Sequence, residues 1–243
     1  MKYIKILFFI GLSLNLYSQQ TENQFKIKYD MYLYFENKPS YNSTLFINNY
    51  ISKFEYSNKD KEDLEVFNDN HVNIIIADTT KYTIITNLRN NNRYSFNSSD
   101  SNSIIAENIE KLNWHLIKDT VKIIGNHNCN FASTVFRGRK YYVWFASDIN
   151  TGFGPWKLNG LPGLIIEAID ETKEVAFYLE SIESYPNKIE EIDFSDKKIF
   201  TEAEYKIKFE KKIENLASKI KSKVARGDNV KVEINVAKKK LEY

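Results

Sequence analysis

His127 and Cys129 are the residues of this sequence whose types and spacing could form a catalytic or metal-binding pair. Two residues apart on a strand, they would place both side chains on the same face of a sheet. A thiol beside an imidazole can be a nucleophile with its base, or half of a metal site. Cys129 is the only cysteine, however, and no CxxC or HxxxH motif accompanies the pair. Because an isolated cysteine is usually a small buried side chain, we expect no catalytic residue here, no metal and no cofactor.

Charged residues near this pair suggest two further kinds of chemistry. Arg137 and Arg139 flank a predicted hairpin turn, where their guanidinium groups could hold a carboxylate or phosphate, or pair with a local acid. Asp148, Glu167 and Asp170 lie a little further along the chain. A hydrolase with two carboxylates needs both acids at a defined distance. Spacing along the chain does not show that distance, so the hydrolase stays an alternative.

The segment 152–163 contains half of the eight glycines and half of the four prolines of the chain. Proline donates no ladder bond and glycine packs no side chain, so the segment must be an ordered turn or loop. As structure, it would be a tight corner in which Trp156 fills the core. As a site, its glycines would admit a ligand, and Phe153 and Trp156 would provide a stacking surface. We favour the structural role, because glycine and proline are first of all conformational devices. The candidate binding residues are Phe153, Gly154, Pro155, Trp156, Gly160, Leu161, Pro162 and Gly163, with Arg137 and Arg139.

Patterns of apolar residues predict the elements that position this segment. Strict alternation over 25–35 is typical of a strand with one buried face. Thr201 and Glu204 have capping-box spacing, and apolar residues at three- and four-residue steps up to Val224 predict a helix with one buried stripe, ending at Gly227. Further strands are predicted at 43–56, 72–77, 82–87, 94–96, 114–117, 121–124, 131–136, 141–146, 164–168 (buried on both faces) and 230–236, with a short helix or loop at 100–111 and a turn at 119–120.

The order of these elements predicts an α+β fold that is mostly β. We expect a large curved antiparallel sheet of eight to twelve strands, half-barrel or bowl-like, with one long C-terminal helix and a final short strand. Residues 1–18 have the layout of a signal peptide, in which Lys2 and Lys5 precede an apolar run too short to span a bilayer, and Ser18 precedes the cut. Residues 19–243 would then be a single domain, exported without a lipid anchor and without an internal disulfide.

Charge narrows the classes of partner. Removal of Lys2 and Lys5 with residues 1–18 would leave 32 basic and 32 acidic residues. A chain without net charge has no global field to attract nucleic acid or an anionic membrane. We therefore expect no nucleic-acid partner. The short apolar run at the N-terminus predicts no membrane span, and the signal-peptide layout predicts a location in the periplasm or outside the cell.

One word of the sequence resembles a known family. Residues 160–165 read GLPGLI, the motif that names the GLPGLI family of exported Bacteroidetes proteins. The similarity extends over 112–170, through GPWK at 154–157, FRGRKYY at 136–142, WF at 144–145 and KIIG at 122–125 with Cys129. The resemblance implies a small exported protein without an established activity, often considered beside outer-membrane uptake systems. More weakly, the chain is similar to the bowl-like β domain in front of one type of bacterial peptide:N-glycosidase, which implies a non-catalytic module.

These observations favour an exported accessory protein that binds an unidentified protein partner or an extended ligand, peptide or glycan, on a concave β surface near 152–163. A carbohydrate-binding module is the first alternative, supported by the many tyrosines and Trp156. An enzyme built on Cys129 or a carboxylate pair is another. A carrier of lipid or another hydrophobic molecule is the last, because a curved sheet closed by a helix can enclose a cavity.

Overall fold

The computed structural model describes residues 24–34, 40–59, 71–73, 80–190, 192–224 and 231–233. Within these residues, twelve strands form one sheet, and two more form a separate two-stranded sheet. The strands of the large sheet are β1 (Gln24–Leu33), β2 (Ser40–Asn48), β3 (Ile51–Asn58), β5 (Tyr82–Asn87), β6 (Asn92–Asn97), β7 (Ser103–Asn108), β8 (His115–Ile124), β9 (His127–Phe136), β10 (Arg139–Ala146), β11 (Leu164–Asp170), β12 (Val175–Ser184) and β13 (Lys198–Phe200). The remaining elements are β4 (His71–Asn73), β14 (Lys231–Glu233), a 3-10 turn at Ser98–Asp100 and one helix, α1 (Glu202–Val224).

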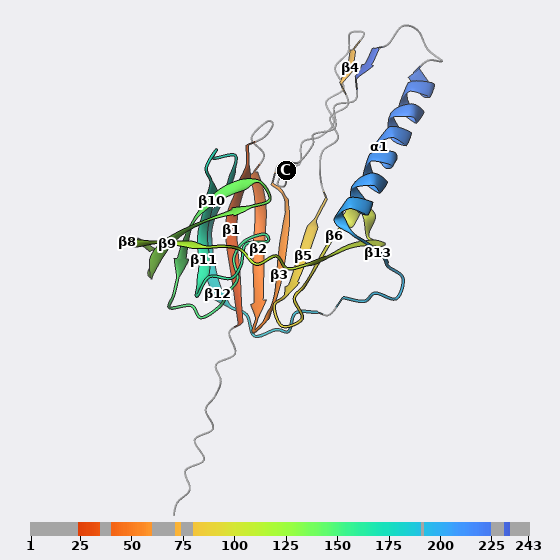
Figure 1. Cartoon of the computed structure of the whole chain (residues 1–243). Coiled ribbons are helices and arrows are strands. Elements are labelled where there is room, and N and C mark those ends of the chain that lie inside the picture. The colour runs from red at the N-terminus through yellow and green to blue at the C-terminus, as the bar shows by residue number, and fades with distance from the viewer. Residues whose placement is uncertain are drawn as a thin grey trace, which may run out of the picture.

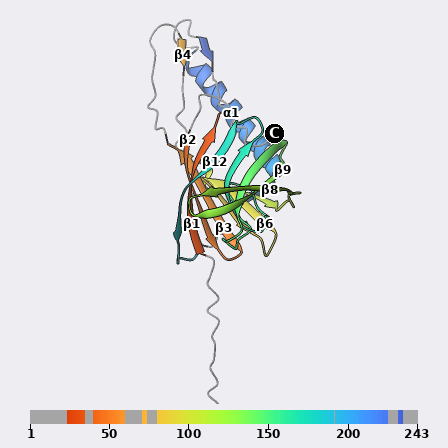
Figure 2. The same ribbon diagram turned by 90° about the vertical axis from the view of Figure 1, so that its left-hand side faces the viewer.

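The large sheet has the strand order β13-β7-β6-β5-β3-β2-β1-β12-β11-β10-β9-β8. All neighbours are antiparallel except β13 and β7, which pair in parallel. The two views of Figures 1 and 2 show that the sheet curls instead of lying flat. The predicted fold class, a large curved and mostly antiparallel sheet with one C-terminal helix, is confirmed.

The connection between β7 and β8 shows how strongly the sheet is curled. These strands lie ten ladder steps apart, which is about 48 Å along a flat sheet at a strand spacing of about 4.8 Å. The connection from Asn108 to His115 reaches at most about 25 Å when fully extended. The sheet must therefore bring its two ends towards each other, and the chain between β7 and β8 crosses in front of the strands (Figure 1).

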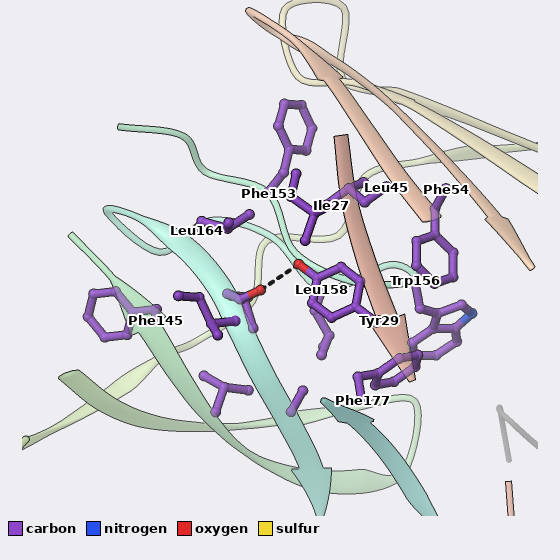
Figure 3. Close-up of a cluster of buried hydrophobic side chains, with 14 of the residues drawn as sticks. Ile27, Tyr29, Leu45, Phe54, Phe145, Phe153, Trp156, Leu158, Leu164 and Phe177 are labelled. Atoms are coloured by element: carbon purple, nitrogen blue, oxygen red, sulfur yellow. Dashed lines mark hydrogen bonds between the residues drawn. The ribbon is translucent and has the colours of Figure 1, made fainter. Parts of the chain in front are cut away.

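The core lies on the concave side, which we call the inner face. In β1, Ile27, Tyr29, Met31 and Leu33 are at most 1% exposed, and the residues between them are partly exposed. The Tyr29 hydroxyl donates a 2.8 Å hydrogen bond to the carbonyl oxygen of Ile165. Figure 3 shows this bond within the core, where side chains of the strands meet those of the segment 151–163. The members labelled there are Ile27, Tyr29, Leu45, Phe54, Phe145, Phe153, Trp156, Leu158, Leu164 and Phe177.

Several predicted strand boundaries are wrong for identifiable reasons. The predicted strand 43–56 is two strands, because Asn49 adopts left-handed backbone (φ 52°) and turns the chain between β2 and β3. The predicted turn at 119–120 is instead an irregularity within β8, where Asp119 has φ 58° and the register shifts between Ile117 and Val121. The stretch predicted as helix or loop at 100–111 contains β7, which pairs with β6 and β13.

The helix begins as predicted but does not bury its apolar stripe. The Thr201 hydroxyl accepts a hydrogen bond from the Glu204 N–H, and the Glu204 carboxylate accepts one from the Thr201 N–H, which completes the capping box. Phe209 is 46% exposed, and Tyr205 and Ile213 are only partly buried. The prediction of a buried stripe is wrong in this part, because α1 contacts the large sheet at its β13–β7 end and leans away from it (Figure 1). Of the helices in the described residues, none has the length and apolarity to cross a membrane.

Some predictions fall outside the described residues. The signal peptide at 1–18, the helix end at Gly227 and most of the strands predicted at 72–77 and 230–236 lie there. The described parts of those two strands, β4 and β14, pair with each other in parallel.

Candidate functional site

The pair His127 and Cys129 is not arranged as a nucleophile with its base. Cys129 is fully buried in β9, and its thiol donates to the backbone carbonyl oxygen of His127 at 3.5 Å. Burial raises the pKa of the thiol, so it stays protonated and unreactive at neutral pH. The His127 ring places Nδ1 2.7 Å from a carboxylate oxygen of Asp148. Within the described ranges, His, Cys, Asp and Glu form no group of three or more that could hold a metal ion.

The other two candidate acids also have basic partners. Glu167 accepts a 2.9 Å hydrogen bond from the Lys122 ammonium group. Asp170 is 2% exposed and lies 2.7 Å from Arg139, which is equally buried and also contacts Glu174 at 2.9 Å. The structure therefore places Arg139 in an internal ion pair with Asp170.

Arg137 joins the two ends of the curled sheet. From the turn between β9 and β10, its guanidinium group contacts Glu107 of β7 at 2.7 Å, and it also pairs with Glu202 at the start of α1. Glu107 is at the same time 3.3 Å from Arg93 and 3.0 Å from Lys157. Three cations from distant parts of the sequence thus contact one carboxylate. These ion pairs connect β7 with the β9–β10 turn and with the segment 151–163.

The segment 151–163 is fixed on the inner face by polar contacts at several points. The guanidinium group of Arg93, which is 1% exposed, donates a 2.9 Å bond to the Lys157 carbonyl oxygen. Trp114 lies in the connection between β7 and β8, and its indole N–H donates a 2.9 Å hydrogen bond to the Asn159 carbonyl oxygen. Phe153 and Asn159 form a β-bridge that folds the segment back on itself. The segment is therefore an ordered corner, as predicted from its glycines and prolines.

The aromatic side chains of this segment point into the core. Phe153 is 2% exposed and Trp156 is 4% exposed. The Trp156 ring lies 5.4 Å from that of Phe136 and 6.3 Å from that of Tyr141. In this structure Trp156 fills the core and offers no stacking surface to solvent. The ten candidate binding residues divide into buried Phe153, Gly154, Pro155, Trp156, Leu161, Gly163 and Arg139, partly exposed Arg137, and exposed Gly160 and Pro162; direct ligand contact by any of them stays a prediction.

Partly exposed aromatic rings gather instead on the opposite, outer face. Register places Phe131 of β9 opposite Trp144 of β10, with ring centroids 4.6 Å apart, and Phe131 also stacks on Tyr142 at 6.0 Å. A second group lies on β1 and β12, where the Tyr32 ring stacks on that of Tyr34 and meets that of Tyr178 edge-on. We call the set the outer aromatic surface: Tyr32, Tyr34, Phe131, Tyr142, Trp144 and Tyr178.

Paired charges lie between and over these rings. Lys122 reaches from β8 to within 5.6 Å of the Trp144 ring and bonds to Glu167 on β11. Lys140 lies 5.0 Å from the Tyr142 ring, and both Lys140 and the Tyr142 hydroxyl bond to Glu171. Each of these two lysines therefore lies near an aromatic ring and is paired with a carboxylate.

The two groups of rings lie on the same face of the sheet and are connected by the register of the strands between them. Burial raises the pKa of the Tyr178 hydroxyl, the nearby Tyr34 and Glu167 add to the rise, and Lys122 opposes it. Register also places Trp144 of β10 opposite Glu167 of β11. The row Tyr142, Ile169, Ala176 and Tyr32 crosses β10, β11, β12 and β1 directly.

A signal for this surface exists in the sequence. The sequence predicts a strand at 141–146, and alternation places Tyr142 and Trp144 on the face opposite Tyr141 and Val143. Both faces of β10 are therefore apolar. Apolar residues on the face that is not turned to the core were the clue that sequence reasoning missed.

Of three comparisons with known proteins, the one with solved structures found similar chains. No protein-family model and no curated protein matches this sequence. Among solved structures, PNGF-II in the C2 space group is similar with a TM-score of 0.48 and 19% identity, over 75% of this chain and 32% of that one. PNGF-II in the P21 space group gives a TM-score of 0.49 and 18% identity, with the same coverage of both chains. This chain thus spans 32% of the length of those proteins.

Proposed function

We propose that this chain is an exported, non-catalytic accessory protein that binds a partner or an extended ligand on its outer aromatic surface. The observation that carries the proposal is the cluster of partly exposed rings on a face that the core does not use. Exposed apolar groups that form a continuous patch are typical of binding sites, whereas single ones are not. Tyrosine and tryptophan are also the residues that contribute most energy to binding surfaces.

The structure of the inner face supports this choice of surface. The segment 151–163 lies on the concave side and its aromatic side chains are in the core, so the concave surface expected from the sequence is occupied by the chain itself. The buried segment and the Arg137 and Arg139 ion pairs then serve as the scaffold that holds the strands of the outer face in place. The candidate catalytic groups have internal partners, which supports a role without catalysis.

Export, and membership of the GLPGLI family, are part of the same proposal and rest on the sequence. The pattern of residues 1–18 supports cleavage after Ser18, and the word at 160–165 supports the family. Determining the N-terminus of the protein recovered from periplasmic and culture fractions tests export. A mature chain that still begins at Met1 and stays inside the cell would contradict it.

Binding is tested without knowledge of the ligand by placing a photoreactive benzophenone side chain at position 142 in the outer aromatic surface. The matched control carries the same group at Ile123, which is 72% exposed and lies on the other face of β8. Irradiation in the native envelope should give adducts from position 142 and not from position 123. Equal adducts from both positions, or none from either, would refute the proposed surface.

A further inference from the structure

We infer that the outer aromatic surface binds an uncharged oligosaccharide, an inference that rests on the binding role proposed above. Carbohydrates present two kinds of surface, apolar faces of C–H groups and a periphery of hydroxyls. A matching site needs aromatic faces for the first, and hydrogen-bond donors and acceptors for the second. Both are present together on this face of the sheet.

The sheet sets the orientation of the rings. Tyr142 and Phe131 stack nearly parallel, with an interplanar angle of 8°, and Trp144 is tilted by 36° from Phe131. These three side chains come from two paired strands, so their positions are set by the ladder instead of a loop. In the second group, Tyr32 and Tyr34 are parallel within 3°. Tyr34 and Tyr178 remain 40% and 37% exposed.

The charges on this face favour a ligand without net charge. Lys122 is paired with Glu167 at 2.9 Å, and Lys140 is paired with Glu171 at 3.0 Å. Neither sign is in excess around the rings, so an acidic or basic polymer would gain little attraction here. The ammonium groups donate hydrogen bonds and the carboxylates accept them, and the hydroxyls of a sugar can bond to both kinds of group.

The extent of the surface favours a chain of sugars over a single one. Trp144 on β10 and Tyr178 on β12 are two ladder steps apart, and Tyr32 on β1 is three steps from β10. At a strand spacing of about 4.8 Å, these are distances of about 10 and 14 Å. A single sugar ring contacts one group only, whereas an oligosaccharide running across the strands contacts both.

The experiment is native gel electrophoresis of the full chain through gels that contain one polysaccharide each. The probes are the uncharged glucan, mannan and arabinoxylan and the anionic alginate. We expect retardation by at least one uncharged probe and not by alginate. Trp144→Ala and Tyr178→Ala should each weaken the retarding interaction by about tenfold or more. Ile123→Ala, an exposed apolar change on the other face, should leave it unchanged, and Trp144→Tyr, which keeps a ring, should retain most of it.

The outcomes separate this inference from the proposed function. No retardation by any uncharged probe, together with protein adducts from position 142, would overturn the sugar inference and leave the binding surface standing. No retardation and no adducts would overturn both. Retardation by alginate to the same degree would overturn the argument from paired charges. Because Trp144→Ala could unfold the chain, its circular dichroism and Tm are measured first. If it is unfolded, the more exposed Tyr178→Ala decides: unchanged retardation would overturn the inference.

Discussion

Replacing Gly163 by alanine should destabilise the fold more than any other single glycine change in the segment 151–163. The Cβ of an alanine at this position would lie 2.3 Å from the carbonyl oxygen of Ala146 and 2.7 Å from its carbonyl carbon. Ala146 belongs to β10 and pairs with Leu164 of β11. The clash is therefore with backbone, and relief requires the two strands to separate. The backbone angle φ of +156° adds strain for any residue with a side chain.

The magnitude follows from two contributions. A strained backbone conformation costs about 1–3 kcal/mol, and overpacking of a filled interior costs about 1–3 kcal/mol. Gly163→Ala should thus lower the free energy of unfolding by about 2–6 kcal/mol, a large share of the roughly 5–15 kcal/mol typical of folded proteins.

Two other glycines of the segment separate these contributions. Gly160 has φ +94°, and an added Cβ would find its nearest heavy atom at 3.7 Å, so Gly160→Ala tests strain alone. An added Cβ at Gly154 would lie 2.6 Å from the Cβ of Ile165, which is fully buried, so Gly154→Ala tests the clash alone. Each should cost about 1–3 kcal/mol.

The assay is urea unfolding followed by tryptophan fluorescence, to which the core residue Trp156 contributes. Wild type should have the highest urea midpoint, Gly160→Ala and Gly154→Ala intermediate midpoints, and Gly163→Ala the lowest. A midpoint for Gly163→Ala equal to that of Gly160→Ala, at equal slopes, would refute the close approach of the segment to β10. If Gly163→Ala does not fold, that result agrees with the prediction, and Gly154→Ala remains the quantitative test.

Three further predictions concern buried polar groups. Tyr29→Phe removes the bond to the Ile165 carbonyl and should cost about 1–2 kcal/mol at neutral pH. Burial raises the pKa of Tyr29 well above its ordinary 10.0, so the stability that its protonated form contributes is complete below pH 10 and is lost as pH rises further. The free energy of unfolding of Tyr29→Phe should therefore fall less steeply with pH above 10 than that of wild type. Identical slopes would contradict this. The Cys129 thiol should resist a thiol-specific reagent until urea unfolds the chain, and rapid native labelling would be inconsistent with its burial. Asp170→Asn breaks the buried pair with Arg139 and should lower the free energy of unfolding by about 3–5 kcal/mol, with a loss below 1 kcal/mol counting against the ion pair.

Local rules were sufficient for part of this fold. Alternation places the four buried residues of β1 because a strand has a period of two. The sequence predicts a turn between the strands at 131–136 and 141–146. The structure has a shorter turn there, at Arg137 and Gly138, which both adopt left-handed backbone (φ 50° and 75°), as a two-residue hairpin requires. The ordered corner at 152–163 follows from glycine and proline alone. These features depend on residues close in sequence.

Long-range contacts decided the rest. The ion cluster at Glu107 joins Arg93, Arg137 and Lys157, which become neighbours only after a sheet of twelve strands has curled. The helix stripe predicts burial correctly only if a sheet face lies beneath it, and α1 meets the β13–β7 end of the sheet instead. Periodicity reports that a face is apolar and does not report what covers it.

The same limit explains the outer aromatic surface and gives it meaning. On β10, Tyr141 and Val143 are fully buried on the inner face, whereas Tyr142 and Trp144 are partly exposed on the other. The chain folds a whole segment onto the inner face to cover it. A polar residue at 142 or 144 would be compatible with the same ladder, because these side chains are not needed to fill the core. Because the core does not use Tyr142 and Trp144, we propose that a molecule outside the fold contacts these rings. The inner face of β10 then belongs to the scaffold, and its outer face belongs to the proposed site.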